Sequence, residues 1–140
     1  MSLRTWQVLV LVPVLLLVGS ALAPSAVPPD TKPPWKMAEA KYEAAMATCR
    51  ALAIEYQDGR ATYQQVAEWS RRWREAQKDV KTKRAEQQAA YEEHVKRMEE
   101  LEKVANDRFT SKRGTKSEVH ATEYLRIEAE MEWSRFKSSK

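Results

Sequence analysis

The sequence predicts an all-α protein, and three observations lead to this prediction. From Trp35 to Lys140 the chain contains no proline and only two glycines, Gly59 and Gly114. Alanine, glutamate, lysine, arginine and glutamine dominate the same stretch, and all of them are strong helix formers. Apolar residues recur there at alternating spacings of three and four, whereas no segment alternates with a period of two for long enough to predict a strand.

The first apolar series predicts a helix that ends close to Gly59. Its seam positions have the spacing of a coiled coil: Tyr42, Ala45, Cys49, Leu52 and Tyr56. The segment 57–60 (QDGR) is typical of a helix C-terminus that has glycine in the left-handed conformation. Thr62 is predicted to cap the next helix, with Gln65 three residues later as in a capping box.

The apolar seam continues beyond Thr62 in further series. They comprise Val66, Trp69, Trp73, Ala76 and Val80, followed by Tyr91, Met98, Leu101, Ala105 and Phe109. The segment 112–114 (KRG) predicts a second turn, after which Thr115 or Ser117 is expected to cap the last helix, with Glu118 in range of Thr115. The stripe of that helix comprises Tyr124, Ile127 and Met131, with Trp133 and Phe136 adding apolar bulk near its end.

The expected architecture is an elongated antiparallel coiled coil, a rod made of a short, a long and a short helix. It spans residues 36–138, with turns near 58–61 and 112–115. The helices have about 22, 50 and 22 residues, which makes the central one about 75 Å long. Its middle, 81–88 (KTKRAEQQ), has almost no apolar residue, as expected if the short helices fold back from opposite ends and leave it uncovered. A break at 79–82, giving four helices, is the alternative.

The first 23 residues have the pattern of a secretory signal peptide. Arg4 supplies a positive start, 8–18 (VLVLVPVLLLV) an apolar run, and 19–23 (GSALA) the small residues that signal peptidase recognises. The run is about half of the ~20 residues that span a bilayer. We therefore expect cleavage and a periplasmic or secreted chain, whereas an uncleaved segment would tether it to a membrane. Residues 24–35 contain five prolines and predict an extended linker.

The charge pattern argues against a nucleic-acid-binding protein. The formal net charge is +4 and would fall to +3 with the loss of Arg4, and basic and acidic residues interleave along the predicted helices. The densest basic stretches, 71–74 (RRWR) and 81–84 (KTKR), are too short and too close to glutamates to form a stripe along a phosphate backbone.

The chain has a single cysteine, Cys49, so no disulfide can form within it. In an oxidising compartment Cys49 is either a buried core residue or one half of a disulfide between two chains. Free cysteines are among the most buried residues, which favours the first interpretation.

No residue pattern predicts a catalytic, cofactor or metal site, so we expect a protein that is not an enzyme. His94 and His120 lie on different predicted helices, and His94 is expected to be a packing or surface residue. The adjacent carboxylates at 92–93 and 99–100 belong to charged stretches that are usually solvated. His94 with Met98 four residues later is the one candidate pair for a soft metal, and a single pair is too few ligands for a site.

The two predicted turns are versions of one sequence at an offset of 53 residues. The segment 56–66 (YQDGRATYQQV) aligns with 109–119 (FTSKRGTKSEV), so that an aromatic residue, an arginine, a small residue, a threonine and a valine coincide. Ten residues past each valine, Ala76 preceded by Glu75 matches Ala129 preceded by Glu128. We interpret the pattern as an internal duplication.

This repeated pattern resembles the periplasmic hairpin tip of TolC-type outer-membrane efflux proteins, in which long coiled-coil helices reverse and meet a periplasmic adaptor protein. The copies keep the family spacing at Tyr56, Gly59, Thr62 and Val66, and at Phe109, Thr115, Glu118 and Val119. The resemblance implies that Gly59 and Gly114 are turn residues and that Val66 and Val119 pack beneath the turns. Lys112 replaces the glycine expected in the second copy, and Gln65 replaces an acidic residue in the first. Since no barrel strands are predicted, the resemblance implies a hairpin-tip module and not a channel.

These features predict an exported structural or interaction module of a bacterial cell envelope. The residues expected to form its docking turns are Gly59, Arg60, Thr62, Arg113, Gly114 and Thr115. Trp69 and Trp73 are large for a two-stranded seam and are expected to face a further partner. We expect protein partners in the envelope, efflux components among them, and a homo-oligomer, with neither nucleic acid nor a small-molecule substrate.

The alternative function is that of a holdase-type chaperone, which would grip unfolded envelope proteins between helical arms through Trp69 and Trp73. A helix that lies on a membrane surface is less favoured, because no segment combines a broad apolar face with a basic one.

Overall fold

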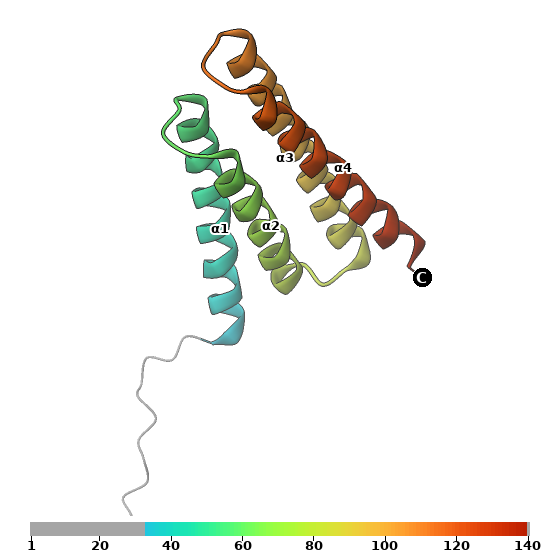
Figure 1. Cartoon of the computed structure of the whole chain (residues 1–140). Coiled ribbons are helices and arrows are strands. Elements are labelled where there is room, and N and C mark those ends of the chain that lie inside the picture. The colour runs from blue at the N-terminus through green and yellow to red at the C-terminus, as the bar shows by residue number, and fades with distance from the viewer. Residues whose placement is uncertain (1–32, 140) are drawn as a thin grey trace, which may run out of the picture. The chain divides into compact units, whose positions relative to one another are not determined.

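The computed structural model describes residues 33–139, in which four helices and no strand occur, so the all-α prediction is confirmed. The helices are α1 (Pro34–Gln57), α2 (Tyr63–Val80), α3 (Arg84–Thr110) and α4 (Lys116–Ser138), shown in Figure 1. The predicted signal peptide and most of the predicted linker lie outside the described residues. None of the described helices has the length and apolar character that a membrane span needs.

α1 begins at Pro34, two residues before the predicted start of the helical domain. Proline is well tolerated at the first position of a helix, because the N–H that it lacks would have no partner within the helix. The N–H groups of Lys36 and Met37 donate to the carbonyl of Pro33, at 2.9 and 3.2 Å, and thereby close the first turn.

The prediction of one long central helix is wrong, because the structure divides it into α2 and α3 at residues 81–83. α2 ends where the Lys81 N–H donates to the Gln77 carbonyl at 2.8 Å, and α3 starts where the Glu86 N–H donates to the Lys83 carbonyl at 3.0 Å. The break lies in the stretch that has almost no apolar side chain, so no buried seam supports a continuous helix there. The four-helix alternative therefore replaces the three-helix rod.

The helices pack in chain order, as two antiparallel hairpins joined through α2 and α3. Figure 1 shows both hairpin turns at one end of the four helices and the α2–α3 connection at the other. In this described part, α1 makes no contact with α4, so the helices do not close into a bundle. We call α2 and α3 the inner helices, and α1 and α4 the outer helices.

Two apolar clusters form the core. One unites the two hairpins and comprises Tyr56, Val66, Ala67, Met98, Leu101 and Ala129. The other lies between α1 and α2 and comprises Ala45, Cys49, Trp73 and Ala76. Most predicted seam positions of the first three helices are thus buried or half-buried, whereas Val80 and Phe109, each the last of its series, are exposed.

The stripe predicted for the last helix is wrong. Tyr124, Ile127 and Met131 are 64%, 42% and 50% exposed, whereas Thr122 and Ala129 are the buried residues of α4. α4 packs mainly on α3, and a helix with one main neighbour buries only a narrow stripe. Small residues in that stripe allow a close approach, and the bulkier side chains remain outside. At the end of α4, Trp133 and Phe136 stack on Tyr91 of α3, with centroid distances of 6.3 and 4.6 Å.

Candidate functional site

The turn residues that the sequence singles out lie in two loops at one end of the helices. Residues 58–62, which connect α1 to α2, form the first tip, and residues 111–115, which connect α3 to α4, form the second tip. The first tip contains Gly59, Arg60 and Thr62, and the second contains Arg113, Gly114 and Thr115.

The first tip closes α1 with a set of backbone hydrogen bonds. The N–H groups of Arg60 and Ala61 donate to the Glu55 carbonyl at 2.7 and 3.2 Å, and the Gly59 N–H donates to the Tyr56 carbonyl at 3.0 Å. A helix C-terminus satisfies its last carbonyls in this way when the chain turns through a residue in the left-handed conformation. Gly59 is that residue, with φ of +78°, as predicted.

The second tip makes the same backbone bonds at the offset of 53 residues seen in the sequence. The N–H groups of Arg113 and Gly114 donate to the Arg108 carbonyl at 2.7 and 3.0 Å, and the Lys112 N–H donates to the Phe109 carbonyl at 3.0 Å. The two tips therefore share one backbone pattern, whereas duplication as its origin stays a prediction.

The left-handed residue of the second tip is Lys112, with φ of +59°, and not Gly114. Lys112 aligns with Gly59, so the spacing of the repeat locates this position although the residue type differs. Gly114 has a different role, because a Cβ there would lie 2.8 Å from the Glu118 Oε2 and 3.1 Å from the Arg108 Cβ. Gly114 permits a close approach of α3 and the start of α4.

Each tip ends in a capping box that starts the next helix, and both predicted caps are confirmed. The hydroxyl of Thr62 accepts from the Gln65 N–H at 3.3 Å, and that of Thr115 accepts from the Glu118 N–H at the same distance. In return, the side-chain oxygens of Gln65 and Glu118 accept from the threonine N–H groups, at 2.9 and 3.1 Å. The caps fix the direction in which each chain leaves its tip.

Arg108, two residues before the end of α3, joins the two tips. Its Nη1 donates to the Tyr56 carbonyl at 2.7 Å and its Nη2 donates to the Arg113 carbonyl at 3.1 Å. The guanidinium also lies 4.7 Å from the centroid of the Tyr56 ring, and Arg108 is only 9% exposed. Hydrogen bonds from a charged donor are stronger than neutral ones, so this contact holds the tips together. Sequence analysis missed Arg108, whose only signal is that it aligns with Glu55 in the repeat.

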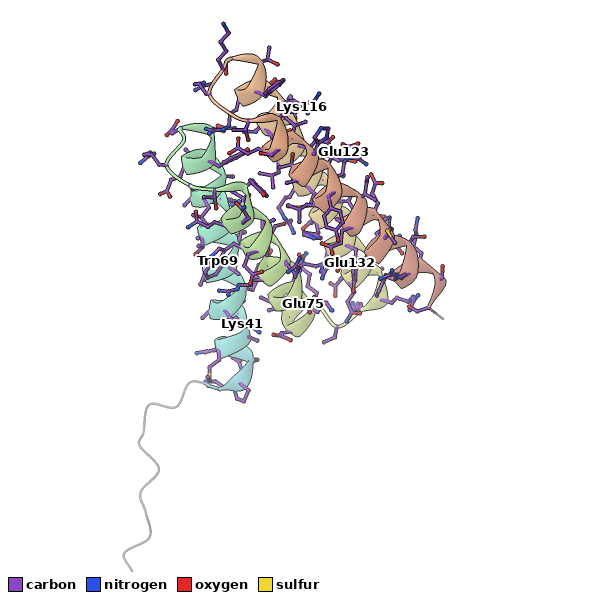
Figure 2. The ribbon with its side chains drawn as sticks, in the orientation of Figure 1. Lys41, Trp69, Glu75, Lys116, Glu123 and Glu132 are labelled. Atoms are coloured by element: carbon purple, nitrogen blue, oxygen red, sulfur yellow. The ribbon has the colours of Figure 1, made fainter. Side chains whose placement is uncertain are left out.

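The exposed side chains around the tips carry an excess of positive charge. The cations are Arg60, Lys112, Arg113 and Lys116, and the exposed carboxylates are Asp58 and Asp107. Asp58 and Arg60 form an ion pair at 2.8 Å, which neutralises one charge of each sign. Figure 2 labels Lys116 where α4 leaves the second tip. The tips thus present a net positive face, beside which the ring of Phe109 is 44% exposed.

Trp69 and Trp73 do not form an open face. Trp73 is 8% exposed and belongs to the core, with the Arg97 guanidinium 3.9 Å from its ring centroid. Trp69 is half-buried, with the Arg72 guanidinium 4.8 Å from its ring centroid. Cys49 is also in the core, at 3% exposed, and burial raises the pKa of its thiol. These positions favour a core role for Cys49 over a disulfide between chains.

A polar layer lies between the inner helices. The Arg97 Nε donates to the Ser70 Oγ at 2.8 Å, and that oxygen lies 2.8 Å from the His94 Nδ1. A hydrogen bond thus joins the Ser70 Oγ to the His94 Nδ1, and the tautomer of the imidazole ring sets which atom donates. Burial, with Arg74, Arg97 and Arg71 nearby, lowers the pKa of His94 to about 3. A serine–histidine hydrogen bond also joins nucleophile and base in hydrolases, but Ser70 is fully buried here and no substrate reaches its oxygen.

Arg74 extends this layer towards α4. It is 5% exposed and pairs with two carboxylates, Glu132 of α4 and Glu75 of α2, both labelled in Figure 2. Nearby, the Gln77 Nε2 donates to the Glu93 Oε2 at 3.3 Å. Away from the tips, the hairpins are therefore joined by paired polar side chains, which a search for apolar seams does not find.

Within residues 33–139, no group of three or more histidine, cysteine, aspartate or glutamate side chains is arranged to hold a metal ion. His94 is bound to Ser70, and Met98 is 1% exposed within the apolar cluster. His120 is exposed and has Glu123 at 3.6 Å as its ion-pair partner. The two histidines thus have separate local contacts.

Comparison with known proteins identifies no relative: no protein-family model, curated protein or solved structure matches the chain. The resemblance of the tips to those of TolC-type efflux proteins rests on the sequence of the turns alone.

Proposed function

We propose that this chain is a non-enzymatic interaction module of the bacterial cell envelope, which docks a protein partner through its two tips. The observation that carries the proposal is the contact of Arg108 with the carbonyls of Tyr56 and Arg113. This contact orders both loops before any partner arrives. A surface that is already ordered loses less conformational entropy on binding, so it binds more tightly for a given contact area.

The partner that fits this surface is a protein with an acidic face. Four exposed cations lie around the tips against two exposed carboxylates, one of which is already paired with Arg60, while the half-buried carboxylate of Glu118 accepts from the Thr115 N–H. Complementary charge speeds association and disfavours basic partners. The similarity of the turns to efflux-protein hairpin tips supports a periplasmic adaptor protein as the first candidate to test. The signal-peptide pattern of residues 1–23 supports a periplasmic or secreted location, with a membrane tether if cleavage does not occur.

Self-association belongs to the same proposal. Tyr124, Ile127 and Met131 follow the spacing of a coiled-coil seam on the exposed face of α4, and a second copy of the chain is the partner we expect there. Sedimentation at low and high protein concentration tests this expectation. A mass that stays at one chain at both concentrations would contradict it.

The holdase alternative has less support. It assigned client binding to Trp69 and Trp73, but Trp73 is a core residue and an arginine lies over each of the two rings. A chaperone would have to use the scattered exposed apolar residues instead.

Photo-crosslinking in cells that encode the chain tests the docking proposal. A crosslinking amino acid is placed at Arg60 or Lys112 in the tips, and as the control at Glu39 or Glu43, which are exposed at the end of α1 away from the tips. We expect one envelope protein to be captured from the tip positions, and its capture to fall several-fold when Arg113 and Lys116 are changed to glutamate.

The control positions decide between the two functions. Equal capture of many proteins from tip and control positions would favour the holdase and overturn docking through the tips. Capture of cytoplasmic proteins alone would overturn the exported location. A single envelope partner whose capture withstands the charge reversal would overturn the role given to the basic face.

A further inference from the structure

A mainly apolar cavity of about 280 Å³ lies between α1 and α3, with α2 behind it. Its apolar wall consists of Cys49, Ala53, Val66, Trp73, Leu101 and Val104. Two cations, Arg50 and Arg97, and one carboxylate, Glu100, also line it, so the charged groups at the cavity have a net positive sum. An apolar pocket with a few charged groups is the usual form of a site for a small ligand.

Arg97 is a mostly buried cation that has no carboxylate at hydrogen-bond distance among the described residues. Its side chain is 17% exposed, and its ion pair among the described residues is with Glu93 at 3.9 Å. Its hydrogen bonds go to uncharged groups, the Ser70 hydroxyl at 2.8 Å and the Ser70 carbonyl at 3.5 Å. Burial is the main reason that the pKa of Arg97 is lowered to about 10. A charge removed from water is costly unless an opposite charge accompanies it.

Arg74 is a second buried arginine, and its positive charge is compensated by two carboxylates. It pairs with both Glu75 and Glu132, and these carboxylates keep its pKa raised although burial opposes this. Among the described residues, Arg97 has only the longer contact with Glu93, at 3.9 Å, and it is Arg97 that borders the cavity. The difference indicates that a carboxylate in the cavity would complete the contacts of Arg97.

A further feature of the wall favours a ligand with an anionic head. The guanidinium of Arg50, which is exposed at the rim, lies 5.5 Å from the centroid of the Trp73 ring, so both arginines stand next to Trp73. Two guanidinium groups beside one ring can both donate charge-assisted hydrogen bonds to a carboxylate.

We propose that this cavity binds a single-chain amphiphile with a carboxylate head, such as a medium-chain fatty acid. The head lies beside Arg97 and Arg50, and the chain lies on the apolar wall formed by Ala53, Val66 and Leu101. An apolar cavity of about 150 Å³ accepts benzene, so a cavity about twice as large suits a chain of about ten carbons. Glu100 lies three residues from Arg97 and repels the head from that part of the wall. This binding site is separate from the tips and does not depend on their docking.

Calorimetric titration of the full chain with decanoate at neutral pH tests the proposal. We expect one decanoate per chain. Decanol, which has the same chain without the charge, should bind about tenfold more weakly, because it lacks the charge-assisted hydrogen bonds to arginine. Decyltrimethylammonium, which has a cationic head, should not bind at the same concentrations.

Single-residue variants test whether decanoate binds in this cavity. Arg50→Gln should weaken decanoate binding about fivefold to tenfold, whereas Arg72→Gln should leave it unchanged. Arg72 is a close control, because it is also an exposed arginine over a tryptophan ring but does not line the cavity. Glu100→Gln should strengthen binding, and Arg97→Lys should retain more of it than Arg97→Gln.

The result does not depend on the Arg97 variants alone, since Arg50 is exposed and its replacement leaves the core intact. Equal affinity for decanol and decanoate would overturn the proposal. The same holds for an equal loss in the Arg50 and Arg72 variants, and for binding of several decanoates per chain. Absence of binding at about 1 mM decanoate would also overturn it.

Discussion

The two tips have the same backbone hydrogen bonds and different side chains. In the first tip the left-handed position is Gly59, whereas in the second it is Lys112, with φ of +59°. Ala61 of the first tip aligns with Gly114 of the second, and Glu55 aligns with Arg108. The comparison separates two uses of glycine: one relieves backbone strain, and the other makes room for a neighbouring helix. It also locates an asymmetry before the tips: α3 supplies Arg108, which joins both tips, whereas α1 has Glu55 at the equivalent position.

The same comparison applies along the helices. Equivalent positions of the repeat lie on an inner helix in one copy and on an outer helix in the other, so they have different surroundings. The position of buried His94 in α3 is taken in α1 by exposed Lys41, which pairs with Asp79 at 2.8 Å. The position of buried Arg74 in α2 is taken in α4 by exposed Ile127. Burial therefore follows the neighbours of the helix and not the polarity of the residue.

Among the variants of the tips, the replacement of Arg108 should lower the free energy of unfolding most. Arg108→Ala leaves the carbonyls of Tyr56 and Arg113 without their charged donor, and we expect the free energy of unfolding in urea to fall by about 3 kcal/mol. Arg113→Ala is the matched control, because its side chain is exposed, and it should change stability by less than about 0.5 kcal/mol. Equal effects of the two variants would show that the tips are not held by Arg108.

Lowering the pH should destabilise the folded chain, because His94 is buried as a neutral ring in the polar layer between the inner helices. Its pKa is about 3 in the folded chain and ordinary, near 6.5, in the unfolded chain. Between these values the unfolded chain takes up a proton and the folded chain does not, so stability falls as the pH falls from 6.5 towards 3. The slope is at most about 1.4 kcal/mol per pH unit, or about 2 kcal/mol by pH 5.

Urea unfolding of the wild-type chain, His94→Gln and His120→Gln at several pH values isolates this effect. The wild type and the variant of exposed His120 should lose stability more steeply below pH 6.5 than His94→Gln does. Parallel profiles for all three chains would contradict a neutral, buried His94.

Adding a methyl group to the glycine of the second tip tests its role in close packing. The new Cβ of Gly114→Ala would meet the side chains of Glu118 and Arg108 at 2.8 and 3.1 Å, and we expect a loss of about 2 kcal/mol in the free energy of unfolding. The reciprocal change in the first tip, Ala61→Gly, should cost less than about 1 kcal/mol. A larger loss for Ala61→Gly would reverse the assignment of the two positions.

The smallest effects should come from the left-handed positions themselves. Gly59→Ala should cost about 1 kcal/mol, because a Cβ is unfavourable at positive φ. Lys112→Gly should gain about 0.5 kcal/mol, since relief of the same strain is partly offset by the greater freedom of glycine in the unfolded chain. Thermal unfolding of both variants checks the opposite signs, and a destabilised Lys112→Gly would show that the lysine side chain makes a favourable contact.

Local rules of helix formation predicted much of this fold. The caps at Thr62 and Thr115 and the left-handed Gly59 depend on residues within a few positions, and the sequence displays those residues. The apolar seams of the first three helices also follow from spacing alone. Whether the long stretch after Thr62 is one helix or two was not predictable in the same way, because continuity depends on which neighbour covers the polar segment 81–88.

The remaining errors concern contacts between hairpins. Tyr124, Ile127 and Met131 have seam spacing, but only the packing of α4 on α3 determines that small residues face inward. Arg108 and Arg97 resemble ordinary charged helix residues in the sequence, and their partners lie on other helices. Buried polar contacts between elements carry no periodic signal, so both the link between the tips and the cavity emerge only from the structure.

The order in which these contacts form has a consequence for the end of the molecule that carries the two tips. Each helix packs mainly on a helix adjacent to it in the chain, and folds dominated by local contacts form within microseconds to milliseconds. Arg108 and Tyr56 are 52 residues apart, so their contact requires both hairpins to be in place. An interaction that forms after the rate-limiting step affects the unfolding rate more than the folding rate. We expect the Arg108 contact to form late and therefore to set how long the paired tips persist, a lifetime on which the proposed docking of a partner depends.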